Sequence, residues 1–316
     1  MPVKPHTGRL FYRIGYTAAF FSLLSLAARV LGRAGSSCLA RALARIYCAT
    51  QPAIVRIVAE NLALFENRAV LSADAAKVFE NFAITLADYL WMGSCSSAEG
   101  FALADLESDL QHFRTACADG RGAILVTGHY SFFEYGVLVL GQMGFPVSAI
   151  THAEPTPALT RWRAEYRLRW GAETIELGND SFSSLRAVEA IKSGRLTAML
   201  VDRPNEGRAL AIDLPGGSIS YSLAPALLSW MTGCAVVPVC VRRKDSGRYA
   251  IISRAPIRAD RSLPRAEALA SCTRQIAASL NAEFLQDPLQ LYHFVPLQPN
   301  ACAAGKIDNG TFAVGG

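Results

Sequence analysis

A histidine and an acid, His129 and Glu134, lie close together in the segment AILVTGHYSFFEYG, which spans residues 123 to 136. The segment begins with a short apolar run that predicts a buried strand, and a Thr-Gly pair ends that run directly before the histidine. A carboxylate that accepts a hydrogen bond from one imidazole nitrogen leaves the other nitrogen free to remove a proton from a substrate hydroxyl. The pair therefore predicts a histidine general base with a carboxylate that orients it.

The spacing of this pair decides where it can lie. Residues that share one face of a helix are about three or four positions apart, whereas Glu134 is five positions after His129. We therefore place His129 in a strand-to-helix turn, with Glu134 in the first helical turns accepting a hydrogen bond from Nδ1 of His129. Open α/β sheets bind their ligands in such loops, beyond the carboxyl ends of the strands. The structural alternative is that His129 only caps the helix.

A sheet is needed to hold this turn, and the chain after Gly122 alternates short apolar runs with longer amphipathic segments. The expected strands are Ala123–Val126, Val147–Ile150, Thr174–Leu177, Thr197–Val201, Ala235–Val241 and Tyr249–Ser253. The expected helices are Phe132–Met143, Pro157–Trp170, Ser181–Ser193, Ser222–Thr232 and Pro264–Gln286. This alternation predicts an α/β fold with a mixed, mostly parallel sheet flanked by helices.

The residues before this region are helical in pattern. From Ser37 to Trp91, apolar residues recur at helical spacing, which predicts helices that cover one side of the sheet. The chain has 316 residues, of which 51% are hydrophobic, so it can form one large domain and is not a disordered protein. Charged residues make up 18% of the chain, against about 25% in an average soluble protein. This apolar excess predicts contact with lipid.

The amino-terminal apolar segment IGYTAAFFSLLSLAA has fifteen residues between Arg13 and Arg29, and a spanning helix needs about 20. It fits a membrane helix extended by snorkelling arginines, a helix lying in one leaflet, a cleaved signal peptide or a core helix. The helical pattern continues past Arg29, which favours a retained anchor. We divide the chain into an anchor helix, residues 1–35, an enzymatic domain, residues 36–300, and a flexible tail, residues 301–316.

Charge and cysteine usage limit the partners. The formal net charge is +5, and basic residues flank the apolar segment on both sides, which favours an anionic lipid surface. These residues are Lys4, Arg9, Arg13, Arg29, Arg33, Arg41 and Arg45. No zinc-finger spacing, RNP-like pattern or basic-region heptad is present, so we expect no nucleic acid. The eight cysteines show neither metal-ligand nor disulfide spacing, which predicts no metal site and a reducing compartment.

The sequence lacks the motifs G-x-S-x-G, G-x-x-x-x-G-K-[ST], G-x-G-x-x-G and H-E-x-x-H. Instead, the block with His129 and Glu134 resembles the H-x-x-x-x-D/E motif of the bacterial lipid A biosynthesis acyltransferases, within the lysophospholipid acyltransferase-like superfamily. Further blocks agree with this family in order and spacing, from about residue 10 to residue 297. They are RIVAENL at 56–62, RLRWGAETI at 167–175, MLVDRP at 199–204 and SLAPALLSWMTGCAVVPVCVRR at 222–243.

The resemblance implies a glycerolipid acyltransferase-like fold and the transfer of a fatty acyl group from a thioester to a hydroxyl of a membrane glycolipid or lipid A-like acceptor. The donor would be an acyl carrier protein or coenzyme A thioester, with no further cofactor, and the site would lie on the cytoplasmic side of the bacterial inner membrane. His129 would be the base and Glu134 its orienter. Arg167 and Arg169 are candidates to bind substrate or the oxyanion, or else they form a basic helix surface. Asp202 orients an arginine or a substrate group, or is a turn residue.

The chain departs from the family pattern in three places, which bear on the acceptor more than on acyl transfer. IDLPGG at 212–217 replaces an aromatic stretch, and THAEPTP at 151–157 lacks a Pro-x-x-Asn pattern. DPLQLYHF at 287–294 has His293 near the position of a family tryptophan, and we expect this histidine to be a packed, hydrogen-bonded core residue. Two other functions stay open, namely a thioesterase or acyl hydrolase that uses the same pair, and a lipid-binding protein without activity.

Overall fold

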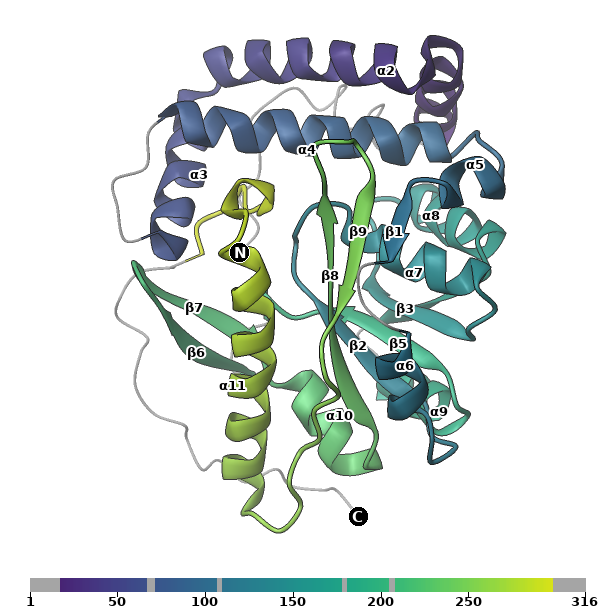
Figure 1. The fold of residues 1–316 in the computed structure, drawn as a ribbon, viewed down its shortest axis with the longest axis vertical. Coiled ribbons are helices and arrows are strands. Elements are labelled where there is room, and N and C mark those ends of the chain that lie inside the picture. The colour runs from purple at the N-terminus through teal and green to yellow at the C-terminus, as the bar shows by residue number, and fades with distance from the viewer. Residues whose placement is uncertain (1–17, 67–71, 107–109, 178–180, 205–207, 298–316) are drawn as a thin grey trace.

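The structure is a computed structural model that describes residues 18–66, 72–106, 110–177, 181–204 and 208–297. Within them, a seven-stranded sheet has the order β1-β9-β8-β2-β5-β3-β4 (Figure 1). Its strands are β1 Ala104–Leu106, β2 Ala123–Thr127, β3 Val147–His152, β4 Ala172–Leu177, β5 Leu196–Leu200, β8 Ala235–Arg243 and β9 Tyr249–Ser253. Only the β8–β9 pair is antiparallel among these neighbours, so the predicted mixed, mostly parallel α/β fold is confirmed.

Helices cover both faces of this sheet, and three of them form a layer at one end of it (Figure 1). The end layer consists of α2 Ala18–Thr50, α3 Pro52–Phe65 and α4 Ser72–Met92. The remaining helices are α5 Ser97–Phe101, α6 Gln111–Ala116, α7 Phe133–Gln142, α8 Pro157–Arg169, α9 Ser181–Lys192, α10 Ala224–Thr232, α11 Arg265–Phe284 and the 3-10 turn η1 Pro288–Gln290. The predicted helices after Gly122 are therefore present, with ends shifted by a few residues.

The central strands are apolar on both faces because each face packs against helices. In β2, the side chains of Ala123 and Leu125 join a core that includes residues of α7 and α8. Those of Ile124 and Val126 join a second core that includes residues of α10 and α11. All four are buried, so the turn that follows β2 is held from both sides of the sheet.

Two features of the sheet region were not predicted from the sequence pattern. A hairpin of β6, Ala209–Leu214, and β7, Gly217–Ser222, lies beside α11 as a separate two-stranded sheet (Figure 1). The predicted helix from Ser222 begins instead at Ala224, where Pro225 occupies the first turn. Strand β1 has only three residues, which is too few to show a period-two pattern.

Helix α2 extends well past the predicted anchor. It bends at Gly32, whose φ of 67° and ψ of 170° are non-helical, and it continues to Thr50 while packing along α4 (Figure 1). In the part of the chain that the structure describes, α2 is the helix long and apolar enough to cross a membrane, with a mean hydropathy of 1.3 over eighteen residues and 11% of them buried. Residues 1–17, with Lys4, Arg9 and Arg13, and the tail lie outside the described residues.

Candidate active site

The candidate site is formed where two neighbouring parallel strands end together. Thr127 at the end of β2 pairs with Leu200 at the end of β5. His129 and Asp202 each follow two residues after these paired positions. Parallel strands in register deliver the residues beyond their carboxyl ends to the same edge of the sheet. The fold therefore brings His129 and Asp202 together, although they are far apart in the sequence.

Asp202 holds His129 through two hydrogen bonds. Nδ1 of His129 lies 2.8 Å from Oδ1 of Asp202, and the backbone N–H of His129 donates to Oδ2 at 2.6 Å. The carboxylate is fully buried, while the imidazole is 23% exposed. A carboxylate on Nδ1 selects the tautomer in which Nδ1 carries the proton, so Nε2 is left with a free lone pair. Nε2 of the partly exposed His129 ring can therefore act as a base.

A second histidine lies on the other side of the same carboxylate. Nε2 of the buried His293 lies 3.2 Å from Oδ2 of Asp202. Nε of Arg203 donates to Nδ1 of His293 at 3.3 Å, and the same guanidinium donates to the carbonyl of Tyr292 at 2.6 Å. Because Nδ1 accepts the hydrogen bond from Arg203, the neutral ring carries its proton on Nε2, the nitrogen on the side of Asp202. Arg203, His293, Asp202 and His129 thus form one polar chain.

The charges and hydrogen bonds within this group of four residues keep Asp202 ionised. Burial disfavours the charged carboxylate, but the charges and hydrogen bonds of His129 and His293 outweigh it and hold the pKa of Asp202 well below its ordinary value. Burial also lowers the pKa of His293, against the opposing effect of Asp202. The neutral His293 contacts the charged Asp202 at 3.2 Å without a well-aligned hydrogen bond, so the negative charge is available to stabilise a protonated His129.

The Thr-Gly-His turn needs its glycine for a steric reason. A Cβ on Gly128 would lie 2.8 Å from Oδ2 of Asp202 and 2.8 Å from the ring of Phe284. Only a residue without a side chain lets the carboxylate approach the backbone of the turn this closely. Ser131, at the end of the turn, has a φ of 47°, the positive-φ conformation that is uncommon outside glycine. The turn is therefore built around Asp202.

Glu134 does not orient His129, and that part of the sequence prediction is wrong. Its Oε2 accepts a hydrogen bond from Nη2 of Arg163 at 2.8 Å, and its Oε1 accepts one from Nε of Arg167. Both arginines lie on α8, one helical turn apart. Burial raises the pKa of Glu134, but the two guanidinium groups reverse this and lower it from the ordinary value of 4.5. Glu134 is thus a buried anion neutralised by two cations.

Glu134 pairs with the arginines and not with His129 because of their charge and because of the direction in which its side chain points. Buried carboxylates need strong charge-assisted partners, and two guanidinium groups satisfy Glu134 better than one neutral imidazole would. Position 134 also lies in the first turn of α7, directed toward α8, whereas His129 is directed toward the end of β5.

The two arginines predicted to bind substrate lie apart from each other. Arg167 is buried, bonded to Glu134, and its Nη1 donates to the hydroxyl of Thr174 at 3.2 Å. Arg169 is directed elsewhere, donating to the carbonyl of Gly93 at 2.8 Å and lying over the ring of Tyr166. They therefore do not form one binding surface, and their contact with substrate remains a prediction.

Comparison with protein families supports the expectation raised by the motif. The family model described as bacterial lipid A biosynthesis acyltransferase matches residues 23–296, which is most of the chain. The chain belongs to this acyltransferase family. Comparison with curated protein sequences gave no match. Membership shows an enzyme that transfers acyl groups to a lipid acceptor, and it agrees with the fold described above.

Within this acyltransferase, Glu134→Gln is expected to act on stability. Removing one charge of a buried ion pair typically costs about 3 kcal/mol, because the partner cations stay buried without compensation. Since the pKa of Glu134 is lowered on folding, its stabilising contribution is present above the ordinary carboxyl pKa and is lost as the pH falls through the lowered value. The variant should therefore unfold at lower urea concentration at neutral pH, with a smaller difference from the unchanged protein in acid.

Glu165→Gln is the matched control, because Glu165 is exposed on α8, the same helix that carries Arg163 and Arg167. Equal urea midpoints for both variants would contradict a stabilising role of the Glu134 ion pairs.

Two residues of the site were missed or misassigned at the level of sequence. The sequence prediction makes Asp202 either a residue that orients an arginine or a substrate group or a turn residue, and it makes His293 a packed, hydrogen-bonded core residue. The sequence does contain a signal for Asp202, since His129 and Asp202 each follow the end of an expected parallel strand by no more than three residues. His293 offered no such signal because it lies on an irregular segment after η1, whose path only the fold determines.

Proposed function

We propose that this acyltransferase is membrane-associated and moves a fatty acyl group from an acyl carrier protein or coenzyme A thioester to a hydroxyl of a glycolipid or lipid A-like acceptor. The observation that carries the proposal is the His129–Asp202 pair, which leaves Nε2 of His129 free at a partly exposed edge. Acyl transfer to an alcohol needs this kind of base, because an alcohol must lose its proton as it attacks the thioester.

The reaction then follows from the position of the proton. Nε2 of His129 takes the proton of the acceptor hydroxyl while the oxygen attacks the thioester carbonyl carbon, giving a tetrahedral oxyanion. Buried Asp202 stabilises the imidazolium that forms. When the intermediate collapses, the carbon–sulfur bond breaks and the leaving sulfur takes the proton back from Nε2. The products are an ester and a free thiol, and His129 returns to its starting state.

The oxyanion requires donors close to His129. Helix α7 begins at Phe133, four residues after the base. The amide of Tyr135 donates to the carbonyl of Phe132, whereas the amides of Phe133 and Glu134 have no hydrogen-bond partner among the described residues. Such amides and the positive end of the helix dipole favour negative charge. We propose that these amides, rather than Arg167, stabilise the oxyanion, because Arg167 is already bonded to Glu134 and Thr174.

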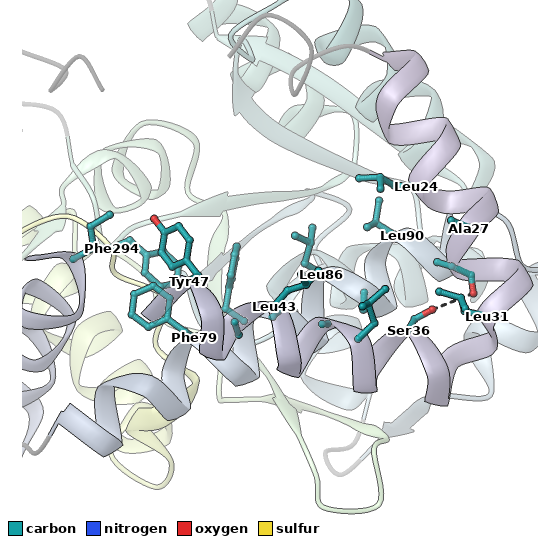
Figure 2. Close-up of a pocket in the computed structure, with 18 residues that line it drawn as sticks. Leu24, Ala27, Leu31, Ser36, Leu43, Tyr47, Phe79, Leu86, Leu90 and Phe294 are labelled. Carbon is teal, nitrogen blue, oxygen red and sulfur yellow. Dashed lines mark hydrogen bonds between the residues drawn. The ribbon is translucent and has the colours of Figure 1, made fainter. Parts of the chain in front are cut away.

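An apolar groove close to the site can hold hydrocarbon. It lies between α2 and α4, has a volume of about 570 Å³, and is lined by side chains that are nearly all apolar (Figure 2). Leu24 and Ala27 line one end and Phe294 lines the other, as Figure 2 shows. Phe294 follows His293 directly in the chain. A lipid chain in the groove would therefore end near the polar chain that contains Asp202.

The outer surface of α2 supports membrane association. Large apolar side chains are exposed along it, and contiguous exposed apolar surface marks an interaction site. These are Leu23, Leu26, Val30, Leu31, Leu39, Leu43, Ile46 and Tyr47. We propose that α2 contacts the inner membrane of a bacterium. The free thiols of the described cysteines support a cytoplasmic position for the site.

The proposed activity can be tested by mass spectrometry of total membrane lipids from cells with and without the protein. We expect one glycolipid species to become heavier by one acyl group. An assay with purified enzyme, glycolipid and acyl thioester separates transfer from hydrolysis. Release of free fatty acid without an acylated lipid would instead establish a thioesterase, and neither product would support a lipid-binding protein.

A further inference from the structure

A second site lies on the opposite side of α2 from the apolar groove. Four residues of α2 are spaced four apart and therefore form one stripe, namely Arg33, Ser37, Arg41 and Arg45. Together with the turn between β8 and β9, they line a pocket of about 680 Å³. The end of β8 contributes Arg243, and the turn contributes Ser246 and Gly247. The pocket thus joins arginines from opposite ends of the chain.

Two guanidinium groups of this pocket converge on Gly247. A Cβ at this glycine would lie 3.4 Å from Nη1 of Arg33 and 3.6 Å from Nη2 of Arg243. Like charges this close repel each other unless an anion lies between them. Arg33 is compensated by Asp88, which it contacts at 2.7 and 2.8 Å. Arg243 has no such carboxylate partner among the described residues.

The backbone of Arg243 is fixed by hydrogen bonds, but a donor of its side chain has no acceptor. Its backbone N–H donates to Gln290 at 2.8 Å and its carbonyl accepts from the same side chain at 2.9 Å. Its Nε is buried and has no hydrogen-bond partner in the part of the chain that the structure describes. A buried donor without a partner costs about 1–3 kcal/mol, so the guanidinium of Arg243, which lines the pocket, lacks part of its hydrogen bonding.

The other charges of the pocket leave room for an anion. Arg45 is bonded to Glu80 at 2.8 Å, whereas the exposed Arg41 has no partner among the described residues. Asp245 is exposed and lines the pocket as its acidic group. Two arginines, Arg41 and Arg243, are thus free to bind phosphate oxygens, and the hydroxyls of Ser37 and Ser246 also line the pocket.

We propose that this pocket binds the phosphate of an anionic phospholipid headgroup. This inference rests on the proposed membrane association, because the pocket and the exposed leucines of α2 share one helix. The pocket differs from the site at His129, and it holds the enzyme at the surface independently of the acyl acceptor.

The test measures binding of the full chain to phosphatidylcholine vesicles prepared with and without phosphatidylglycerol. The double variant Arg41→Gln with Arg243→Gln should lose most of the preference for phosphatidylglycerol, about fivefold for each arginine removed. Binding to pure phosphatidylcholine should stay unchanged. Arg274→Gln, on an exposed position of α11, removes the same kind of charge elsewhere and should have little effect.

Each other outcome overturns the inference. An equal loss in the control would show attraction by overall charge only, and no loss in the double variant would exclude these arginines. Displacement of phosphatidylglycerol binding by free coenzyme A would assign the pocket to a donor phosphate. If the double variant fails to fold by circular dichroism, Arg41→Gln alone decides, because its side chain is exposed. Failure to bind phosphatidylcholine would instead count against the proposed membrane association.

Discussion

His129→Ala is expected to lower the rate of acyl transfer by about 10²- to 10⁴-fold, which is the usual contribution of a positioned general base. The variant removes Nε2, the atom that takes the proton from the acceptor hydroxyl. The measurement is the initial rate of acylated lipid formation with purified enzyme. Vesicle binding should be unchanged, because the imidazole is not part of α2 or of the apolar groove.

The control for this variant is His152→Ala, which removes an exposed imidazole at the end of β3. It should keep nearly full activity. Undiminished transfer by the His129 variant would refute the assignment of the base, and equal losses in both variants would point to a general effect on folding.

Asp202→Asn is expected to lower the rate by about 10³- to 10⁴-fold, comparable to the loss seen when the aspartate of a Ser-His-Asp triad is replaced by asparagine. The carboxylate accepts from both Nδ1 and the backbone N–H of His129. An asparagine has one acceptor oxygen and one amide donor in its place. If the amide faces Nδ1, the ring takes the opposite tautomer and Nε2 carries a proton. If it faces the backbone, two donors oppose each other.

This prediction separates Asp202 from its neighbours. His293→Asn removes the imidazole that contacts Asp202 at 3.2 Å but keeps the bond between Asp202 and Nδ1 of His129, so we expect a loss of about tenfold. Asp213→Asn, in the exposed β6–β7 hairpin, makes the same chemical change away from the site and should leave the rate unchanged. A rate for Asp202→Asn that equals that of Asp213→Asn would contradict the role of Asp202 as the orienting carboxylate.

Glu134→Gln provides a further contrast, because the sequence prediction and the structure differ on it. If Glu134 oriented the base, this variant would lose as much activity as Asp202→Asn. The structure instead places Glu134 between Arg163 and Arg167. We therefore expect the larger effect on activity from Asp202→Asn and the larger effect on the free energy of unfolding from Glu134→Gln.

Most of the fold could be predicted from local patterns of apolar and turn-forming residues in the sequence. The strand from Ala123 is apolar at every position because it is buried on both faces, and this run is visible without the structure. The Thr-Gly break before His129 likewise marks the end of that strand. By contrast, the β6–β7 hairpin is not predicted, although the burial of β6 alternates at every residue, because most residues of the two strands are exposed or only partly buried.

The strand-turn-helix unit that presents His129, the mostly parallel sheet and the apolar α2 could thus be predicted, since all three depend on residues that are close together along the chain. The acid that pairs with the histidine could not be predicted, because it depends on which strands lie side by side. The order of strands places β5 beside β2, so Asp202 contacts His129. Helix α8 supplies Arg163 and Arg167, which both bind Glu134. The five-residue spacing between His129 and Glu134 therefore does not make them a pair, because buried charges pair with the strongest partners within reach.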